Sequence, residues 1–160
     1  MTDIEVVKAN LYDPLHTEAL LHICDEYARD PMGMNESLSE AVKIRLIDQL
    51  RNFPTTISFL AFLGGQPVGM ANGFYGFSTF NGKRLINIHD LAVLPPARGK
   101  GAGEALLKAV EKQARLMDCC KVTLEVREDN RARRLYERFG FRYGDPGMLF
   151  MSKELGDPHS

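Results

Sequence analysis

The sequence predicts an α+β fold in which a single mixed, mostly antiparallel sheet is flanked by helices. Two observations support this prediction. First, several strand-like segments are joined by short turns, Gly64-Gly65 and Asn81-Gly82, that favour antiparallel hairpins. Second, one amphipathic segment separates the strand expected over Lys83–Val93 from the strand expected over Lys121–Val126, and a helical crossover of this kind joins parallel strands. We therefore expect one parallel pair of strands.

Length and composition favour one globular domain. The chain has 160 residues, of which 44% are apolar and 26% are charged, and a single domain usually takes about 100–200 residues. We expect one domain over residues 1–160 with its core over 4–155. The 20 basic and 21 acidic residues leave a net charge of −1, so composition favours neither a nucleic-acid nor a membrane partner.

Cysteine content and apolar run length bear on the cellular compartment. The three cysteines, two of them adjacent at Cys119 and Cys120, have neither the pattern of a disulfide framework nor zinc-ligand spacing. Met1–Glu5 carries acidic residues and lacks the apolar core of a signal peptide. The longest apolar runs, such as Phe59–Leu63, are far shorter than the ~18 residues of a membrane span. We expect a cytoplasmic protein with reduced thiols and no bound metal.

The sequence of the first third of the chain indicates one strand and two helices. A strand is expected over Ile4–Val7, and a helix over Pro14–Ala28, because proline suits a first turn and the apolar residues recur at helical spacing. Asp30–Gly33 breaks this helix. A second helix should end at Asn52 and be capped by Ser37, which stands three residues before a glutamate in a capping-box pattern.

The middle of the chain predicts three strands, and the remainder predicts two helices and three more strands. The nearly continuous apolar run Ile57–Leu63 predicts a strand that is buried on both faces. A long strand over Pro67–Phe80 should pair with Lys83–Val93. The later elements are a helix over about 102–117, the strand Lys121–Val126, a short helix over Ala132–Phe139, and closing strands over Phe141–Tyr143 and Met148–Met151.

A glycine-rich turn, Arg98-Gly99-Lys100-Gly101-Ala102-Gly103, lies between a predicted strand and a predicted helix. Its three glycines allow left-handed backbone and close approach of a ligand. The helix behind it directs unpaired N–H groups and the positive end of its dipole toward the turn, and two basic side chains add charge. This pattern favours a pyrophosphate site. The alternative is a turn that serves only tight packing.

Comparison with known phosphate-binding patterns limits the type of ligand that the glycine-rich turn could bind. No segment matches the Walker A pattern. The turn resembles part of the dinucleotide fingerprint, with Glu125 at a suitable distance for a ribose contact, but Leu106 stands where the third glycine belongs. Too little chain follows Val126 for several more parallel βα units. A nicotinamide-dependent enzyme is therefore the weaker alternative.

Three motifs together resemble the GCN5-related N-acetyltransferase (GNAT) superfamily. Arg98-x-x-Gly101-x-Gly103 is similar to its Arg/Gln-x-x-Gly-x-Gly/Ala signature. His89–Pro95 resembles its fourth strand running into the acetyl-CoA loop. Asn130–Phe141 resembles its second motif, Asn-x-x-Ala-x-x-x-Tyr-x-x-x-Gly-Phe. The order of elements is also similar over Ile4–Leu155.

The resemblance implies a sheet that is splayed at the acetyl-CoA site and acetyl transfer to a primary amine of a small molecule by direct attack. It implies no metal, and it implies a homodimer, since dimers are common in this family. Phe77–Lys83 and Asn87–Leu91 are similar to the diamine and polyamine acetyltransferase branch, although His89 stands where that branch has a glutamate. Diamine, amino acid, aminoglycoside and protein acceptors all remain open.

The resemblance also implies residue roles. The main chain near Leu91 and Val93 would bind the pantetheine arm and polarise the thioester, and the glycine turn would bind the phosphates. The expected cofactor-binding residues are Leu91, Ala92, Val93, Arg98, Gly99, Lys100, Gly101, Ala102, Gly103, Asn130, Arg133 and Tyr136.

Tyr136 would donate a proton to the thiolate leaving group, and His89 or Asp90 would take the proton of the amine. Adjacent residues of a strand face opposite ways, so only one of His89 and Asp90 should reach the acceptor. The alternatives are a core tyrosine, a core histidine, and a structural Asp90 paired with a basic neighbour. Asn130 has the alternative of a plain helix cap. A non-catalytic acyl-CoA-binding or sensing domain also remains open.

Overall fold

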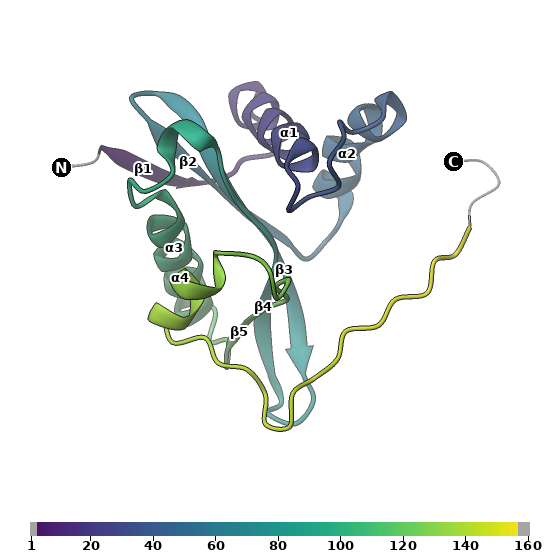
Figure 1. Cartoon of the computed structure of the whole chain (residues 1–160), viewed down its shortest axis with the longest axis vertical. Coiled ribbons are helices and arrows are strands. Elements are labelled where there is room, and N and C mark those ends of the chain that lie inside the picture. The colour runs from purple at the N-terminus through teal and green to yellow at the C-terminus, as the bar shows by residue number, and fades with distance from the viewer. Residues whose placement is uncertain (1–2, 157–160) are drawn as a thin grey trace.

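Five strands form one open sheet in the order β1-β2-β3-β4-β5 in this computed structural model, which describes residues 3–156 (Figure 1). Neighbouring strands are antiparallel except β4 and β5, which are parallel. The predicted mixed, mostly antiparallel sheet with one parallel pair is therefore confirmed. The strands are β1 (Ile4–Lys8), β2 (Thr56–Leu63), β3 (Gln66–Ser78), β4 (Lys83–Val93) and β5 (Val122–Leu124).

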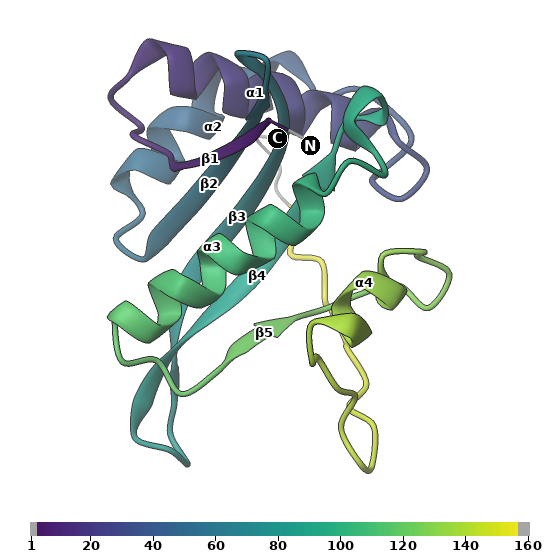
Figure 2. The ribbon, with the colours of Figure 1, turned by 90° about the vertical axis from the view of Figure 1, so that its left-hand side faces the viewer.

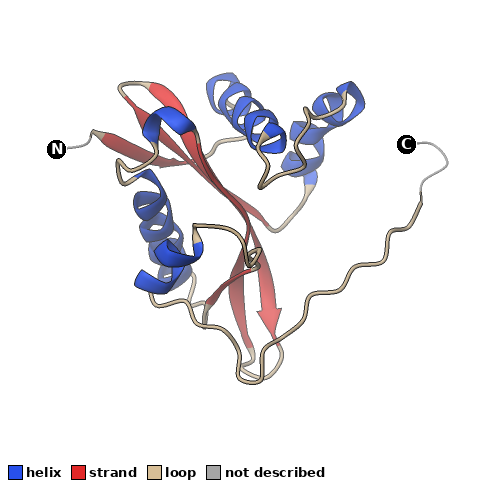
Figure 3. Cartoon of the chain, viewed as in Figure 1, coloured by secondary structure: helices blue, strands red, loops and turns tan. Residues whose placement is uncertain are grey.

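Helices cover both faces of the sheet. Two of them, α1 and α2, lie on one face, and α3 crosses the other face on its way from β4 to β5 (Figures 1 and 2). The α-helices are α1 (Pro14–Arg29), α2 (Glu40–Asn52), α3 (Ala102–Leu116) and α4 (Arg133–Arg138), and a short 3-10 turn covers Pro95–Ala97. Figure 3 shows the resulting three layers by secondary structure. No helix in the described chain is long and apolar enough to cross a membrane.

Two apolar cores lie on either side of the sheet, and β2 contributes to both. Phe59 and Ala61 pack with Leu106 of α3, whereas Leu60 packs with Leu20 of α1 on the opposite face. The prediction of a strand buried on both faces is thus confirmed, because each successive residue of β2 points into one core or the other.

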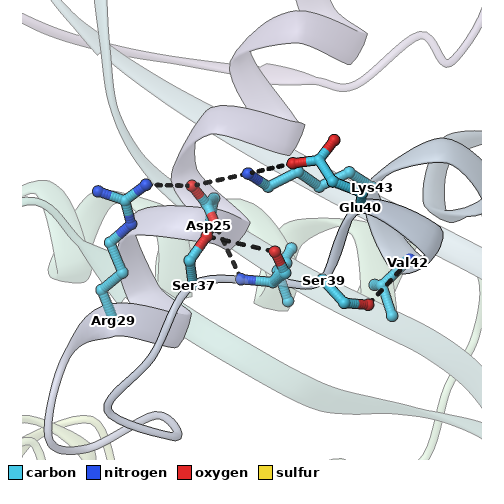
Figure 4. Close-up of polar contacts among 8 residues, drawn as sticks. Asp25, Arg29, Ser37, Ser39, Glu40, Val42 and Lys43 are labelled. Carbon is cyan, nitrogen blue, oxygen red and sulfur yellow. Dashed lines mark hydrogen bonds and ion pairs between the residues drawn. The ribbon is translucent and has the colours of Figure 1, made fainter.

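The cap of α2 differs from the prediction. Ser39, not Ser37, is the N-cap, and its hydroxyl accepts a hydrogen bond of 3.2 Å from the Val42 N–H. Ser37 instead donates to the Asp25 carboxylate on α1 at 2.8 Å (Figure 4). The capping-box pattern was misassigned because the two serines stand two positions apart, and a contact between segments distant in sequence decided which one capped the helix.

Asp25 joins α1 to the start of α2. Besides Ser37, its carboxylate accepts a hydrogen bond of 2.9 Å from the Leu38 N–H. It also pairs with Arg29 at 3.1 Å and with Lys43 at 3.7 Å. Burial acts to raise the pKa of Asp25, but the bonds from Leu38 and Ser37 and the two positive charges outweigh it, so the pKa lies below its ordinary value.

The two predicted closing strands are wrong. Phe141–Tyr143 and Met148–Met151 lie in neither strand nor helix, and the chain after Tyr143 runs away from the sheet (Figure 1). The side chains of Met148–Met151 are between 75% and 92% exposed. Their composition suits a strand, but a strand forms only where a neighbour supplies backbone partners, and among residues 3–156 none pairs with these segments.

We expect Asp25→Asn to lower the free energy of unfolding at neutral pH by about 1–3 kcal/mol, because the amide accepts the hydrogen bonds without attracting Arg29 and Lys43. Because the folded pKa is lowered, this stabilisation is present above the ordinary carboxyl pKa and fades as the pH falls through the lowered value. Urea denaturation at several pH values measures it.

Asp48→Asn is the matched control, since Asp48 also pairs with an arginine but its side chain is 66% exposed. Its effect should stay below about 1 kcal/mol. Equal losses in both variants would contradict a special role of Asp25.

Candidate active site

The parallel strands β4 and β5 separate at the centre of the molecule. Their pairing ends at Ile88 opposite Leu124, whereas β4 continues to Val93 against β3 alone in the described sheet (Figure 2). The sheet is therefore splayed as expected. A cavity of about 80 Å³ lies where the two strands diverge. Its lining residues include Tyr27, Met32, His89, Leu91, Glu125, Arg127, Asn130 and Tyr136.

A β-bulge sets the directions of His89 and Asp90. Asn72 of β3 lies opposite Asp90 and Gly73 lies opposite Ile88, so His89 is an extra residue without a partner. An inserted residue resets the alternation of a strand. The expectation that His89 and Asp90 face opposite ways is therefore wrong.

Both side chains contact the face of β3 that α1 and α2 cover. The His89 ring meets Phe74 edge-on at 5.9 Å between centroids, and the Asp90 carboxylate accepts a hydrogen bond of 3.3 Å from Asn72. Positions 72 and 74 are alternate residues of one strand and share one face. His89 is exposed and lines the cavity, while Asp90 lies deeper.

A buried polar row crosses β2, β3 and β4 behind the cavity. Ser58 donates a hydrogen bond to the Asn72 side-chain oxygen, and the Asn72 amide donates to Asp90. Burial raises the pKa of Asp90, and the opposing effects of His89 and Asn72 do not cancel this. Asp90 is thus a half-buried acid, but its hydrogen-bond partner is an amide and not the basic side chain that the structural alternative expected.

Tyr136 reaches the cavity from α4. It is buried, with only 8% of its surface exposed, and its ring meets Phe141 edge-on at 5.9 Å. Burial raises its pKa to about 12, with a further contribution from the nearby Tyr27. The phenol is therefore protonated at neutral pH, so its hydroxyl can donate a proton or a hydrogen bond there.

Tyr27 is a site residue that the sequence reasoning missed. It lines the same cavity from α1, and burial together with the charges of Asp90 and Asp30 raises its pKa. Its position on the apolar stripe of α1 suggested a core residue. The signal that was available is its phenol, which makes it the one residue of that stripe with a strong hydrogen-bonding group.

The glycine turn forms the other end of the site. Gly99 and Gly101 have φ of +77° and +87°, which is left-handed backbone, and Gly101 caps the 15-residue helix α3. The first helical hydrogen bond is donated by Ala105 to the Gly101 carbonyl. Three amides of the first turn, at Ala102, Gly103 and Glu104, precede it, and no acceptor for them occurs within residues 3–156. Lys100 is exposed beside them.

Gly103 allows α3 to approach α4. A Cβ at this position would stand 2.9 Å from a methyl carbon of Leu135. The third glycine of the turn therefore serves packing, in line with the alternative considered for the turn, while Gly99 and Gly101 serve its conformation.

Arg98 is paired within the chain. Its guanidinium forms an ion pair of 2.9 Å with Asp30 and donates a hydrogen bond of 3.2 Å to the Val93 carbonyl. On the other side of the site, Arg127 donates to the Pro31 carbonyl at 3.2 Å and binds Asp129 at 2.9 Å. The loop after α1 is thus held from both ends of the cleft.

The remaining predicted residues of the second motif also have partners within the chain. The Asn130 side chain accepts a hydrogen bond of 2.9 Å from the Ala132 N–H, as a cap would, while it also lines the cavity. Arg133 donates to the Tyr143 hydroxyl at 2.8 Å and to the Glu128 carbonyl at 2.6 Å. The cavity therefore brings together His89, Leu91, Asn130 and Tyr136 of the predicted set. Its lining does not include Asp90, Ala92, Val93, Arg133 or the glycine turn 98–103.

Two of the three cysteines have thiols with raised pKa values. Burial, followed by Asp90 and Asp25, raises the pKa of Cys24 to about 12, and burial also raises the pKa of Cys119. Both thiols are therefore protonated at neutral pH. Within the described ranges no group of three or more His, Cys, Asp or Glu side chains is placed to hold a metal ion.

Comparisons with known proteins agree with this geometry. A family model described as "Acetyltransferase (GNAT) family" matches residues 19–141. The uncharacterized N-acetyltransferase YhfO of Bacillus subtilis (strain 168) is 36% identical over 94 residues, and the match spans 58% of this chain and 62% of that protein.

Solved structures share the fold at low sequence identity. A probable acetyltransferase superposes with a TM-score of 0.80 at 22% identity, covering 96% of this chain and 99% of the other. The aminoglycoside N-acetyltransferase AAC(6')-Iy, solved with a bisubstrate analogue of CoA and acetylneamine, gives a TM-score of 0.76 at 16% identity, covering 96% and 100% of the two chains.

Proposed function

The chain belongs to the Acetyltransferase (GNAT) family, and we propose that it transfers an acetyl group from acetyl-CoA to a primary amine of a small molecule. One observation carries this proposal. The cleft between β4 and β5 has the glycine turn at one end, and a protonated, buried tyrosine lines the cavity inside it. A cofactor with a pyrophosphate and a thioester needs these two features.

The glycine turn would hold the pyrophosphate. The free N–H groups of the first turn of α3 and the positive dipole end of that helix favour an anion there. Lys100, which forms no ion pair among residues 3–156, adds a positive charge, whereas the charge of Arg98 is partly offset by Asp30. We assign Arg98 mainly to holding the loop after α1, and Lys100 with the backbone to the phosphates.

The pantetheine arm would lie along β4 beyond the point where β5 departs. The edge of β4 at Leu91–Val93 offers backbone groups there, much as a sheet edge offers them to an added strand. Asn130, on the opposite wall, and Leu91 both line the cavity into which the thioester would reach. A main-chain N–H at this end of β4 would polarise the thioester carbonyl.

The reaction would proceed by direct attack. The amine nitrogen forms a bond to the thioester carbon, the carbon–sulfur bond breaks, and the thiolate takes a proton from the Tyr136 phenol. The proton lost by the amine goes to His89, and exchange with solvent restores both groups. The raised pKa of Tyr136, about 12, keeps the phenol protonated until the thiolate forms.

His89 suits the role of base better than Asp90. It lines the cavity, while Asp90 is half-buried behind it and hydrogen-bonded to Asn72. Histidine side chains titrate near neutrality.

The acceptor would be a small amine, in the way that AAC(6')-Iy is bound to an acetylneamine analogue. Glu125 lines the cavity and would attract an ammonium group. Diamines and amino acids are further small candidates, and a protein amine is the alternative class. We further propose that the protein acts as a homodimer in the cytoplasm.

The experiment that tests this function has two readouts. Calorimetry measures acetyl-CoA binding, and a panel of diamines, amino acids, aminoglycosides and peptides is assayed for CoA release. Binding with turnover of a small amine supports the proposal. Binding without turnover of any amine would instead favour an acyl-CoA-binding or sensing domain, and binding of a reduced nicotinamide cofactor would overturn the proposal.

We expect Gly101→Val to weaken acetyl-CoA binding roughly ten- to a hundredfold while the fold persists, because a β-branched residue resists the left-handed backbone at φ +87° by about 1–3 kcal/mol. Calorimetry provides the measurement. Gly65→Val is the control, since Gly65 also has a positive φ of +79° and open surroundings but lies in a distant hairpin. Unchanged binding in a folded Gly101→Val protein would show that the phosphates bind elsewhere.

We expect Tyr136→Phe to reduce turnover by about 10²–10⁴-fold with acetyl-CoA still bound, because the ring stays and only the proton donor is lost. With a pKa of about 12, the phenol stays protonated throughout the neutral range, so the loss should not vary with pH there. Initial rates at saturating acetyl-CoA measure it. The exposed Tyr12→Phe serves as the control, and near-normal turnover of Tyr136→Phe would make Tyr136 a packing residue.

We expect His89→Gln to reduce the rate and to flatten its rise with pH, because an amide cannot take the proton of the amine. Asp90→Asn should retain the rising limb. Because the folded pKa of Asp90 is raised, its ionisation costs stability as the pH rises through that pKa, and Asp90→Asn should therefore be at least as stable as the parent at neutral pH.

Rate–pH profiles and denaturation of the three proteins provide the test. If the rate of Asp90→Asn no longer rises with pH while the rate of His89→Gln still does, Asp90 and not His89 takes the proton of the amine. Unchanged profiles in both variants would indicate that solvent deprotonates the amine.

A further inference from the structure

Several large apolar side chains of the C-terminal arm, residues 144–156, are exposed to solvent. Met148–Met151 and Leu155 are each at least 75% exposed, and the arm extends away from the sheet and helices (Figure 1). Exposed apolar patches of this kind mark interaction sites. In an extended segment the four consecutive apolar residues would point alternately to both sides, which is the pattern of a strand that is buried on both faces.

The described sheet of the same chain has an open edge to which such a strand could add. In the described sheet β5 is the last strand, so its outer edge has no partner. Beside this edge lies a cavity of about 490 Å³ between α3, β5 and the segment that follows α4. Its apolar lining includes Leu107, Val122, Leu124, Val126, Phe139 and Phe141.

The arm leads away from this cavity in its own chain. Phe141–Tyr143 borders the cavity opposite β5, and Tyr143 is fixed there by hydrogen bonds with Glu137 at 2.9 Å and Arg133 at 2.8 Å. After Tyr143 the chain turns and the arm departs to the far side of the molecule (Figures 1 and 2). The open edge and the apolar strand are thus both present in one chain but apart from each other.

We propose that two copies of this chain exchange their C-terminal arms, each arm adding a strand along the β5 edge of the other copy and filling its cavity. The inference specifies the dimer proposed above and does not depend on acetyl transfer. One symmetric contact would cover both the apolar arm and the open edge of β5, because each copy supplies an arm and a β5 edge with its cavity.

The area involved suits a stable dimer. Ten large apolar side chains, five from each arm, with on the order of 100 Å² each, would remove about 1,000 Å² from water before the groove surfaces are counted. Stable protein interfaces usually bury about 1,200–2,000 Å² in total. The exchange would also support the active site, since Tyr136 lines the cavity that the partner's arm would fill.

Sedimentation of the full chain tests the association. We expect a dimer at micromolar concentration, and a monomer at the same concentration for Leu149→Asp. Ile44→Asp is the control, because Ile44 is 81% exposed on α2, and it should remain dimeric. A monomeric parent protein, or a Leu149→Asp protein that stays dimeric, would overturn the proposal, while a monomer that still binds acetyl-CoA would leave the proposed function intact.

Cross-linking tests the exchange itself. In a protein whose Cys24, Cys119 and Cys120 are replaced by serine, Thr123→Cys and Phe150→Cys are introduced together and joined with a short bismaleimide. Covalent dimers on a denaturing gel are the expected product. A cross-link within one chain would show that the arm folds back onto its own β5, and the exchange would be wrong even if the protein is dimeric.

Discussion

The brevity of the contact between β4 and β5 is the constraint on which the site depends. Parallel pairing covers three residue pairs, from Ile86 and Val122 to Ile88 and Leu124. The bulge at His89 immediately follows the last pair and turns β4 onto a course that β5 does not share. A longer ladder would close the cleft, and a shorter one would leave β5 without an attachment to the sheet. The glycine turn then lies at the free end of β4 because only Leu94 and the 3-10 turn Pro95–Ala97 separate them.

The same bulge explains why polar side chains lie within the apolar layer beneath α1. An apolar core lies under α1, yet Ser58, Asn72 and Asp90 cross the same face of the sheet as a hydrogen-bonded row. Such a row adds less stability than an apolar layer would, and an ionised Asp90 at its end adds a further cost, as its raised pKa indicates. In return, the row ties β4 to β3 and β2 through Asp90, directly after the extra residue. His89 can therefore project into solvent from a rigid strand.

Elements governed by local patterns could be predicted from the sequence. The bounds of β4 match the prediction, and α1 extends only one residue beyond it. Errors arose where a distant contact decided the outcome. Asp25 on α1 draws Ser37 away from the helix cap, and the insertion at His89 appears only when β3 is aligned beside β4. The predicted strand at Met148–Met151 has the correct composition but no partner among residues 3–156, and a partner strand is something that a single segment cannot indicate.

The short parallel contact also has a consequence for the order of folding. The hairpins β2–β3 and β3–β4 join neighbouring segments, so they close at a small entropic cost and early. We expect the β4–β5 pair to form later, because the helix α3 lies between these strands in the sequence and the pair gains only three residue pairs. We therefore expect β5 and α4 to be the last part of the chain to become protected from hydrogen exchange and the first to lose that protection, while the antiparallel core stays intact. Opening of the cleft would thus be an ordinary fluctuation of its least stable unit and would require no dedicated hinge.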